Sequence, residues 1–191
     1  MIRYQVTMTH TEKTFEKLSH MQYDLFCKGN RVSRTILSLA LVLLGVAYGD
    51  EWWGILVIAY GCYLTTSTYS AANHTAHKLT KGIRETGMAF PSSRYEFGEE
   101  QMEIVSLQNE KHPRSSLAYS DVCKMGEDSD YFYIFRNNRG GYMVPKSQLS
   151  NPDDFRSFLE NVTGQVVESK VAPIVRLLRN YQRRKNEPWH L

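Results

Sequence analysis

Three kinds of feature are missing from this 191-residue sequence. Cysteine is scarce, and Cys27, Cys62 and Cys123 lie far apart and are odd in number. This pattern suits a reducing compartment or burial in lipid better than a disulfide framework. The first thirty residues carry several charges and no apolar core, so we expect no signal peptide there. Long blocks of like charge are also absent, and the net charge is only +3.

The residue patterns of common catalytic and metal sites are missing too. The sequence has no Cys-X-X-Cys pair and no Gly-X-Ser-X-Gly turn. His74 and His77 are three residues apart but have no further metal ligand beside them. The Gly140-Gly141 pair precedes no helix, so it is not a phosphate-binding loop. We therefore expect a protein that is not an enzyme and that has no cofactor and no metal.

Charged residues are absent from two long internal stretches, residues 35–49 and 52–73. A bilayer core of roughly 30 Å needs about 20 helical residues. The sequence therefore predicts a two-helix transmembrane hairpin with spans of about 32–49 and 52–72. The alternative is a buried helical hairpin in a soluble domain, but a core helix is rarely apolar on every face.

The flanking charges predict the orientation of this hairpin. Cations gather before the first span and after the second, whereas the turn carries only Asp50 and Glu51. Lysine and arginine stay on the cytoplasmic side, so both termini should be cytoplasmic. Aromatic side chains at the start of the second span match the interfacial belt of membrane proteins. Five residues are assigned to the membrane interface: Arg34, Trp52, Trp53, Lys78 and Lys81.

Four segments follow from the periodicity along the chain. Apolar residues alternate at the start and predict a strand, followed by an amphipathic helix over 11–28, with Thr9 and Glu12 as a capping box. From Pro91 the pattern becomes β, with a polar loop at 111–116 and a hairpin turn at 137–141 that uses positive φ. A helix capped by Ser150 or Asn151 closes this unit. The segments are 1–30, 31–90 (the hairpin with a cytosolic helix extension), 91–163 (antiparallel β with a helix) and 164–191 (a basic amphipathic tail).

Two groups of basic residues are candidate binding surfaces. The tail predicts a short helix that either lies on anionic lipid or packs on the β domain with a solvated basic face. The hairpin arginines either bind an anionic group or form a solvated edge. Because these basic residues are scattered or lie beside the membrane, we expect no nucleic-acid binding. The six residues are Arg136, Arg139, Arg176, Arg179, Arg183 and Arg184.

Several short patterns in the C-terminal half point to a known family. Tyr119 precedes Ser-Asp, an acidic turn leads to an aromatic strand, and an apolar strand ends in Pro145-Lys146. With the preceding strand pair at 93–104, this segment resembles the YcxB-like family of bacterial membrane proteins. The resemblance covers about residues 1–162. It implies an α+β protein of the bacterial inner membrane whose small antiparallel cytosolic domain is similar to pleckstrin-homology-like (PH-like) domains and is closed by a C-terminal helix. It implies no activity and no catalytic residues.

Together these observations predict a membrane-anchored, non-enzymatic module that faces the cytosol and contacts a membrane-protein partner or the lipid surface. An alternative of another class is an immunity protein that neutralises a toxic effector at the inner membrane. The expected partners are thus membrane lipids and a protein or toxin, and the oligomeric state stays open.

Overall fold

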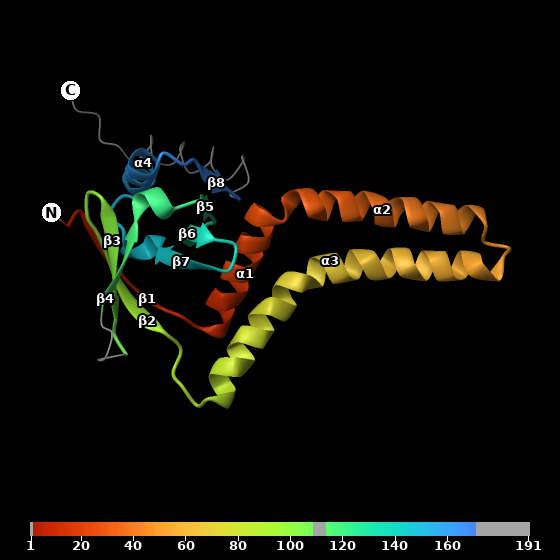
Figure 1. The fold of residues 1–191 in the computed structure, drawn as a ribbon, viewed down its shortest axis with the longest axis horizontal. Helices are drawn as coiled ribbons and strands as arrows, with labels where there is room; N and C mark the ends of the chain where they lie inside the picture. The colour runs from red at the N-terminus through yellow and green to blue at the C-terminus, as the bar shows by residue number, and fades with distance from the viewer. Residues whose placement is uncertain (1, 109–113, 171–191) are drawn as a thin grey trace, which may run out of the picture. The chain divides into compact units, whose positions relative to one another are not determined.

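The computed structural model describes residues 2–108 and 114–170, which form four α-helices and two four-stranded sheets (Figure 1). The predicted α+β class is therefore confirmed. The chain divides into two units, a β unit and a helical unit. The β unit comprises Met1–Met8, Ser93–Asn137 and Gly141–Leu191, and the helical unit comprises Thr9–Ser92 and Asn138–Gly140.

The helical unit begins with α1 (Glu12–Phe26). Thr11 is the N-cap residue: its side chain accepts from the Thr14 backbone, and the Thr14 hydroxyl accepts from the Thr11 backbone. The predicted capping box of Thr9 and Glu12 is therefore wrong. Thr9 is still part of the preceding strand and lies two residues before the residue that caps α1.

Two longer helices follow α1. α2 (Lys28–Ala47) and α3 (Trp52–Glu85) lie side by side along the length of α2, joined by a short turn (Figure 1). α3 runs for 34 residues through the predicted second span and its extension. It ends just before Gly87, which adopts a φ of +67°. Beyond the part that faces α2, α3 contacts α1: Tyr23 Oη lies 3.2 Å from Thr75 Oγ1, and His20 Nε2 lies 2.6 Å from Asn73 Oδ1.

The first sheet of the β unit has the order β1-β2-β3-β4. Its N-terminal strand joins the C-terminal half of the chain, since Arg3 N donates to Phe97 O at 2.8 Å. The predicted loop at 111–116 is wrong in its last three residues, which belong to β4; there Ser116 opposes Glu103 of β3. Their polar side chains are exposed on an edge strand, where they need no apolar alternation. The strands are β1 (Tyr4–Thr9), β2 (Ser92–Phe97), β3 (Gln101–Ser106) and β4 (Arg114–Ala118).

The second sheet has the order β7-β6-β5-β8. β8 was not predicted: its three residues carry no periodicity, and it pairs parallel to β5, with Val167 opposite Met125. The predicted positive φ in the β6–β7 turn is wrong, because among the described residues only Gly87 and Gly164 have positive φ. Gly141 has a different role, since a Cβ there would lie 2.5 Å from the Phe135 ring. The strands are β5 (Lys124–Glu127), β6 (Tyr131–Asn137), β7 (Gly140–Pro145) and β8 (Val167–Ser169).

One helix, α4 (Pro152–Thr163), connects the two sheets of the β unit. Asn151 caps its start, as predicted, by accepting from Asp153 N at 3.2 Å. The fully buried Phe155 ring lies 4.9 Å from Phe97 of the first sheet and 5.3 Å from Phe132 of the second, centroid to centroid. A single aromatic side chain thus packs on both sheets, which fixes α4 over their junction.

Candidate functional site

A buried ion cluster joins β5, the turn after β7 and α4. Glu127 is fully buried, and its carboxylate accepts from Lys146 Nζ at 2.8 Å and from Arg156 Nη2. Lys146 Nζ also donates to Asp128 O at 2.5 Å and lies 4.6 Å from the centre of the Phe132 ring. The turn that carries Lys146 is the 3-10 helix η2 (Lys146–Gln148).

The electrostatics of this cluster hold Glu127 ionised. Burial alone would raise the pKa of Glu127, but hydrogen bonds from Arg156, Lys146 and Ser169 outweigh it and lower the pKa to about 2. A general base works best with a pKa near the operating pH. This carboxylate is therefore suited to holding three elements together rather than to moving protons. Sequence analysis did not single out Glu127 or Arg156; the Pro145-Lys146 pattern was the only signal.

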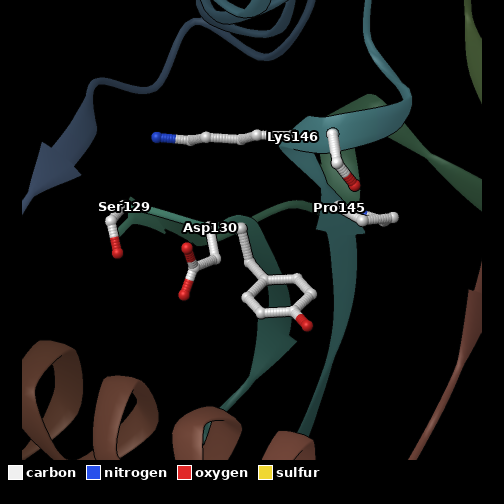
Figure 2. Close-up of a pocket in the computed structure, with 6 residues that line it drawn as sticks. Ser129, Asp130, Pro145 and Lys146 are labelled. Atoms are coloured by element: carbon white, nitrogen blue, oxygen red, sulfur yellow. The ribbon is translucent and has the colours of Figure 1, made fainter.

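A pocket of about 500 Å³ lies beside this cluster. Figure 2 shows the Lys146 side chain extended over the loop that carries Ser129 and Asp130, with its amine directed away from Pro145. That amine already donates to Glu127 and to the Asp128 carbonyl. A ligand in the pocket would therefore contact mainly the other lining residues. The pocket is lined by Ser129, Asp130, Tyr131, Pro145, Lys146 and Ser147. Its lining mixes polar and apolar groups, so it offers contacts to a peptide side chain or a headgroup.

A second candidate site lies in the helical unit. It is a seam of small residues between α2 and α3. Ser38 Oγ donates to Gly61 O at 2.6 Å. A Cβ on Gly45 would lie 2.5 Å from Ile58 Cγ1, and one on Gly61 would lie 2.9 Å from Val42 Cγ2. The two backbones therefore approach as closely as they do in pairs of membrane helices. The seven-residue spacing from Ser38 to Gly45, and from Gly54 to Gly61, was a signal that sequence analysis missed.

The outer surface of the same hairpin carries its large apolar side chains. Trp52 is 73% exposed, Ile36 64% and Leu43 62%. A helix pair in a soluble protein buries residues of this kind and leaves smaller, polar ones outside. The further exposed residues of this surface are Leu37, Leu39, Leu44, Val46, Ile55 and Leu56.

Length and composition single out one helix among the described residues as able to cross a membrane, namely α2. The predicted second span, in α3, does not meet this criterion of length and composition. In α3 the aliphatic run 55–58 is diluted by tryptophan, tyrosine and hydroxyl side chains, which lower its hydropathy.

The five predicted membrane-interface residues all lie on α2 or α3. Arg34, Trp52, Lys78 and Lys81 are exposed, and the Trp53 ring packs at a tilt against Tyr48 with ring centroids 4.9 Å apart. Sequence analysis missed a further group at the other end of the hairpin. There the Arg31 guanidinium pairs with Asp24 and lies 4.8 Å from the centre of the Tyr69 ring.

The predicted binding arginines are placed only in part. Arg136 is exposed on β6 and lies 3.2 Å from Asp121 Oδ2. Arg139 is exposed in the turn between β6 and β7. Arg176, Arg179, Arg183 and Arg184 lie outside the described residues, as does most of the predicted basic tail.

Comparison with known proteins supports the family resemblance. The model of the YcxB-like protein family matches residues 97–161, which is about a third of the chain and runs from the end of β2 into α4. No curated protein matches the sequence. A chain in the structure of the Spt16D Pob3N heterodimer matches with 13% identity and a TM-score of 0.35, over 44% of this chain and 49% of that one. The match thus spans about half the length of that chain, and a TM-score this low does not define a common fold.

Proposed function

We propose that this protein is a non-enzymatic binding module anchored in a membrane by the α2–α3 hairpin, with the YcxB-like β unit in the cytosol. The observation that carries the proposal is the inverted surface of the hairpin. Its glycines and Ser38 are inside, whereas its leucines, isoleucines and Trp52 are outside. This arrangement is stable in the hydrocarbon core of a membrane, because lipid surrounds the large apolar groups and the small residues let the helices pack closely.

The dimensions of the hairpin fit a bilayer. The Tyr48–Trp53 pair lies at one end and the Arg31–Tyr69 pair at the other, as expected of side chains at the two headgroup regions. From Trp52 to Tyr69 the helical rise gives about 26 Å, close to the roughly 30 Å hydrocarbon thickness.

The hydroxyl groups of α3 are also compatible with lipid. Thr66 Oγ1 donates to Cys62 O at 3.0 Å, and Thr68 Oγ1 donates to Leu64 O at 2.7 Å. Bonds of this kind satisfy a hydroxyl within its own helix, so it brings no unpaired polar group into the bilayer. They explain how a helix that falls short on hydropathy can still serve as the second span.

Binding rather than catalysis is supported by the β unit. Its fully buried Glu127 is locked in a structural cluster with Lys146 and Arg156, and the Lys146 amine beside the pocket is held by that cluster. The YcxB-like match and the two sheets closed by α4 are consistent with a PH-like scaffold that contacts a membrane protein or lipid headgroups. Anchoring the module at the bacterial inner membrane raises its effective concentration for such a partner.

Cysteine labelling tests the anchor, because Cys62, Cys123 and Asp50 are all exposed in the structure and differ only in their proposed surroundings. Variants with a single cysteine (Cys62, Cys123 or Asp50→Cys) are treated with a water-soluble maleimide. In intact cells Asp50→Cys should react, Cys123 should react only after lysis, and Cys62 should react only after detergent is added. Fast labelling of Cys62 in native membranes, or release of the protein by alkaline carbonate, would refute the membrane hairpin.

A further inference from the structure

The outward faces of the two hairpin helices differ in chemistry. From Ile36 to Val46 the outward face of α2 is aliphatic, with Ile36, Leu39, Leu43 and Val46 all exposed. The face of α3 that points away from α2 is mixed. It carries five residues at successive spacings of four and three: Leu56, Tyr60, Tyr63, Ser67 and Ser70. We name these five residues the α3 stripe.

Two tyrosines of the α3 stripe lie at a depth where lipid does not suit them. Tyr60 and Tyr63 are 56% and 64% exposed, and their rings stack with centroids 6.4 Å apart. They lie about 12 and 16 Å along the helix from Trp52, near the middle of the proposed span. Neither hydroxyl has a hydrogen-bond partner among the described residues. An unpaired hydroxyl is costly in hydrocarbon, and membrane tyrosines normally gather at the headgroups instead.

We infer that the α3 stripe is covered by the α3 stripe of a second copy of this chain, forming a parallel pair of α3 helices within the membrane. This inference rests on the proposed membrane hairpin. Every copy inserts in the same orientation, so the twofold axis runs along the membrane normal and the two helices are parallel.

Three properties of the stripe point to a second copy as the occupant. A tyrosine hydroxyl both donates and accepts, so a stripe that faces its own copy satisfies both sides. The alternation of four and three residues is the spacing of helix seams that pack knobs into holes. The whole stretch from Trp52 to Asn73 is free of charge, so identical faces meet without repulsion.

Disulfide crosslinking in native membranes tests the inference. Cys27, Cys62 and Cys123 are first replaced by serine in the full-length protein. Leu56→Cys or Ser67→Cys then places a thiol on the stripe and keeps both tyrosines. Leu39→Cys and Leu43→Cys on the α2 face are the matched controls, because these positions are exposed, as Leu56 is, and fall within the first proposed span. Mild oxidation should give a disulfide-linked dimer from the stripe positions and little from the controls.

The other outcomes separate this inference from the anchor. If the protein resists carbonate extraction but no stripe position crosslinks, the dimer is refuted and the anchor stands. Equal crosslinking from both faces, or a stripe product containing a different protein, also refutes the self-pairing. If carbonate releases the protein, the anchor fails and the dimer fails with it. As a second readout, Tyr60→Phe with Tyr63→Phe should weaken dimerisation in detergent about tenfold, since it removes only the hydroxyls; an unchanged dimer would refute their role.

Discussion

At the scale of single residues, Glu127 is the centre of the buried ion cluster in the β unit. It is fully buried and neutralises two cations from different elements. Removing one partner from a buried ionic cluster leaves the remaining charges unpaired. We expect Glu127→Ala to lower the free energy of unfolding of the β unit by about 3–5 kcal/mol. Thermal melts of the detergent-solubilised protein, followed by the β-sheet infrared band, measure the change. Glu168→Ala on the exposed side of β8 is the control and should alter stability by less than about 0.5 kcal/mol.

The low pKa of Glu127 also predicts how stability depends on pH. Its value in the folded protein, about 2, lies below the ordinary 4.5, so the unfolded chain takes up the proton first as the pH falls. The stabilisation is present above pH 4.5 and is lost as the pH approaches 2, which amounts to about 3 kcal/mol. The same infrared melts at pH 7 and pH 3 should show a larger drop for the natural protein than for Glu127→Gln. Equal drops would mean that other carboxyl groups carry the acid sensitivity.

At the scale of elements, glycine is a weak helix former, but the close packing of α2 against α3 requires it at Gly45, Gly54 and Gly61. An isolated helix gains about 1 kcal/mol when alanine replaces glycine. At Gly82 a Cβ would meet nothing within 4 Å, whereas at Gly61 it would lie 2.9 Å from Val42 Cγ2 and 3.0 Å from Ser38 O.

The prediction is therefore one of opposite sign at these two positions. Gly82→Ala should stabilise the helical unit, and Gly61→Ala should destabilise it by about 1–3 kcal/mol, because the helices must move apart. Resistance of the detergent-solubilised hairpin to proteolysis at rising temperature gives the order of stability. Equal stabilisation by both substitutions would show that the close approach at Gly61 does not constrain the helices.

At the scale of the whole molecule, the chain leaves the first sheet after β1 and returns at β2. The points of departure and return are adjacent, since His10 N donates to Pro91 O at 2.9 Å and the Thr9 and Ser92 hydroxyls lie 2.9 Å apart. The helices α1, α2 and α3 are thus an insertion between two neighbouring strands of the first sheet.

We expect that a short linker can consequently replace α1, α2 and α3. We expect a chain of residues 1–10 joined by a few glycine and serine residues to residues 91–191 to be folded and soluble without detergent. Residues 91–191 alone should aggregate or unfold more readily, because β2 loses its neighbour and becomes an unprotected edge. Circular dichroism and size-exclusion chromatography distinguish the two chains. Equal behaviour would mean that β1 adds little to the first sheet.

Much of the element order was predictable from the sequence for local reasons. Period-2 alternation marked β1, and runs free of charge marked α2 and the first half of α3. Asn151 marked the start of α4. Each of these signals arises from residues close together in the chain, so no tertiary contact is needed to read it. The membrane hairpin, the immunity alternative and the binding partners remain predictions.

What only the tertiary structure decided are the contacts between distant residues. Glu127, Lys146 and Arg156 meet because β5, η2 and α4 converge, and β8 forms because β5 offers it an edge. Ser38 meets Gly61 because two helices pack closely. Hydrophobic periodicity tells which face of an element is buried, but it does not tell against what that face is buried. The sequence by itself therefore determined most of the elements and the family resemblance, and the three-dimensional packing determined the ion cluster, the seam and the exposed face of α3.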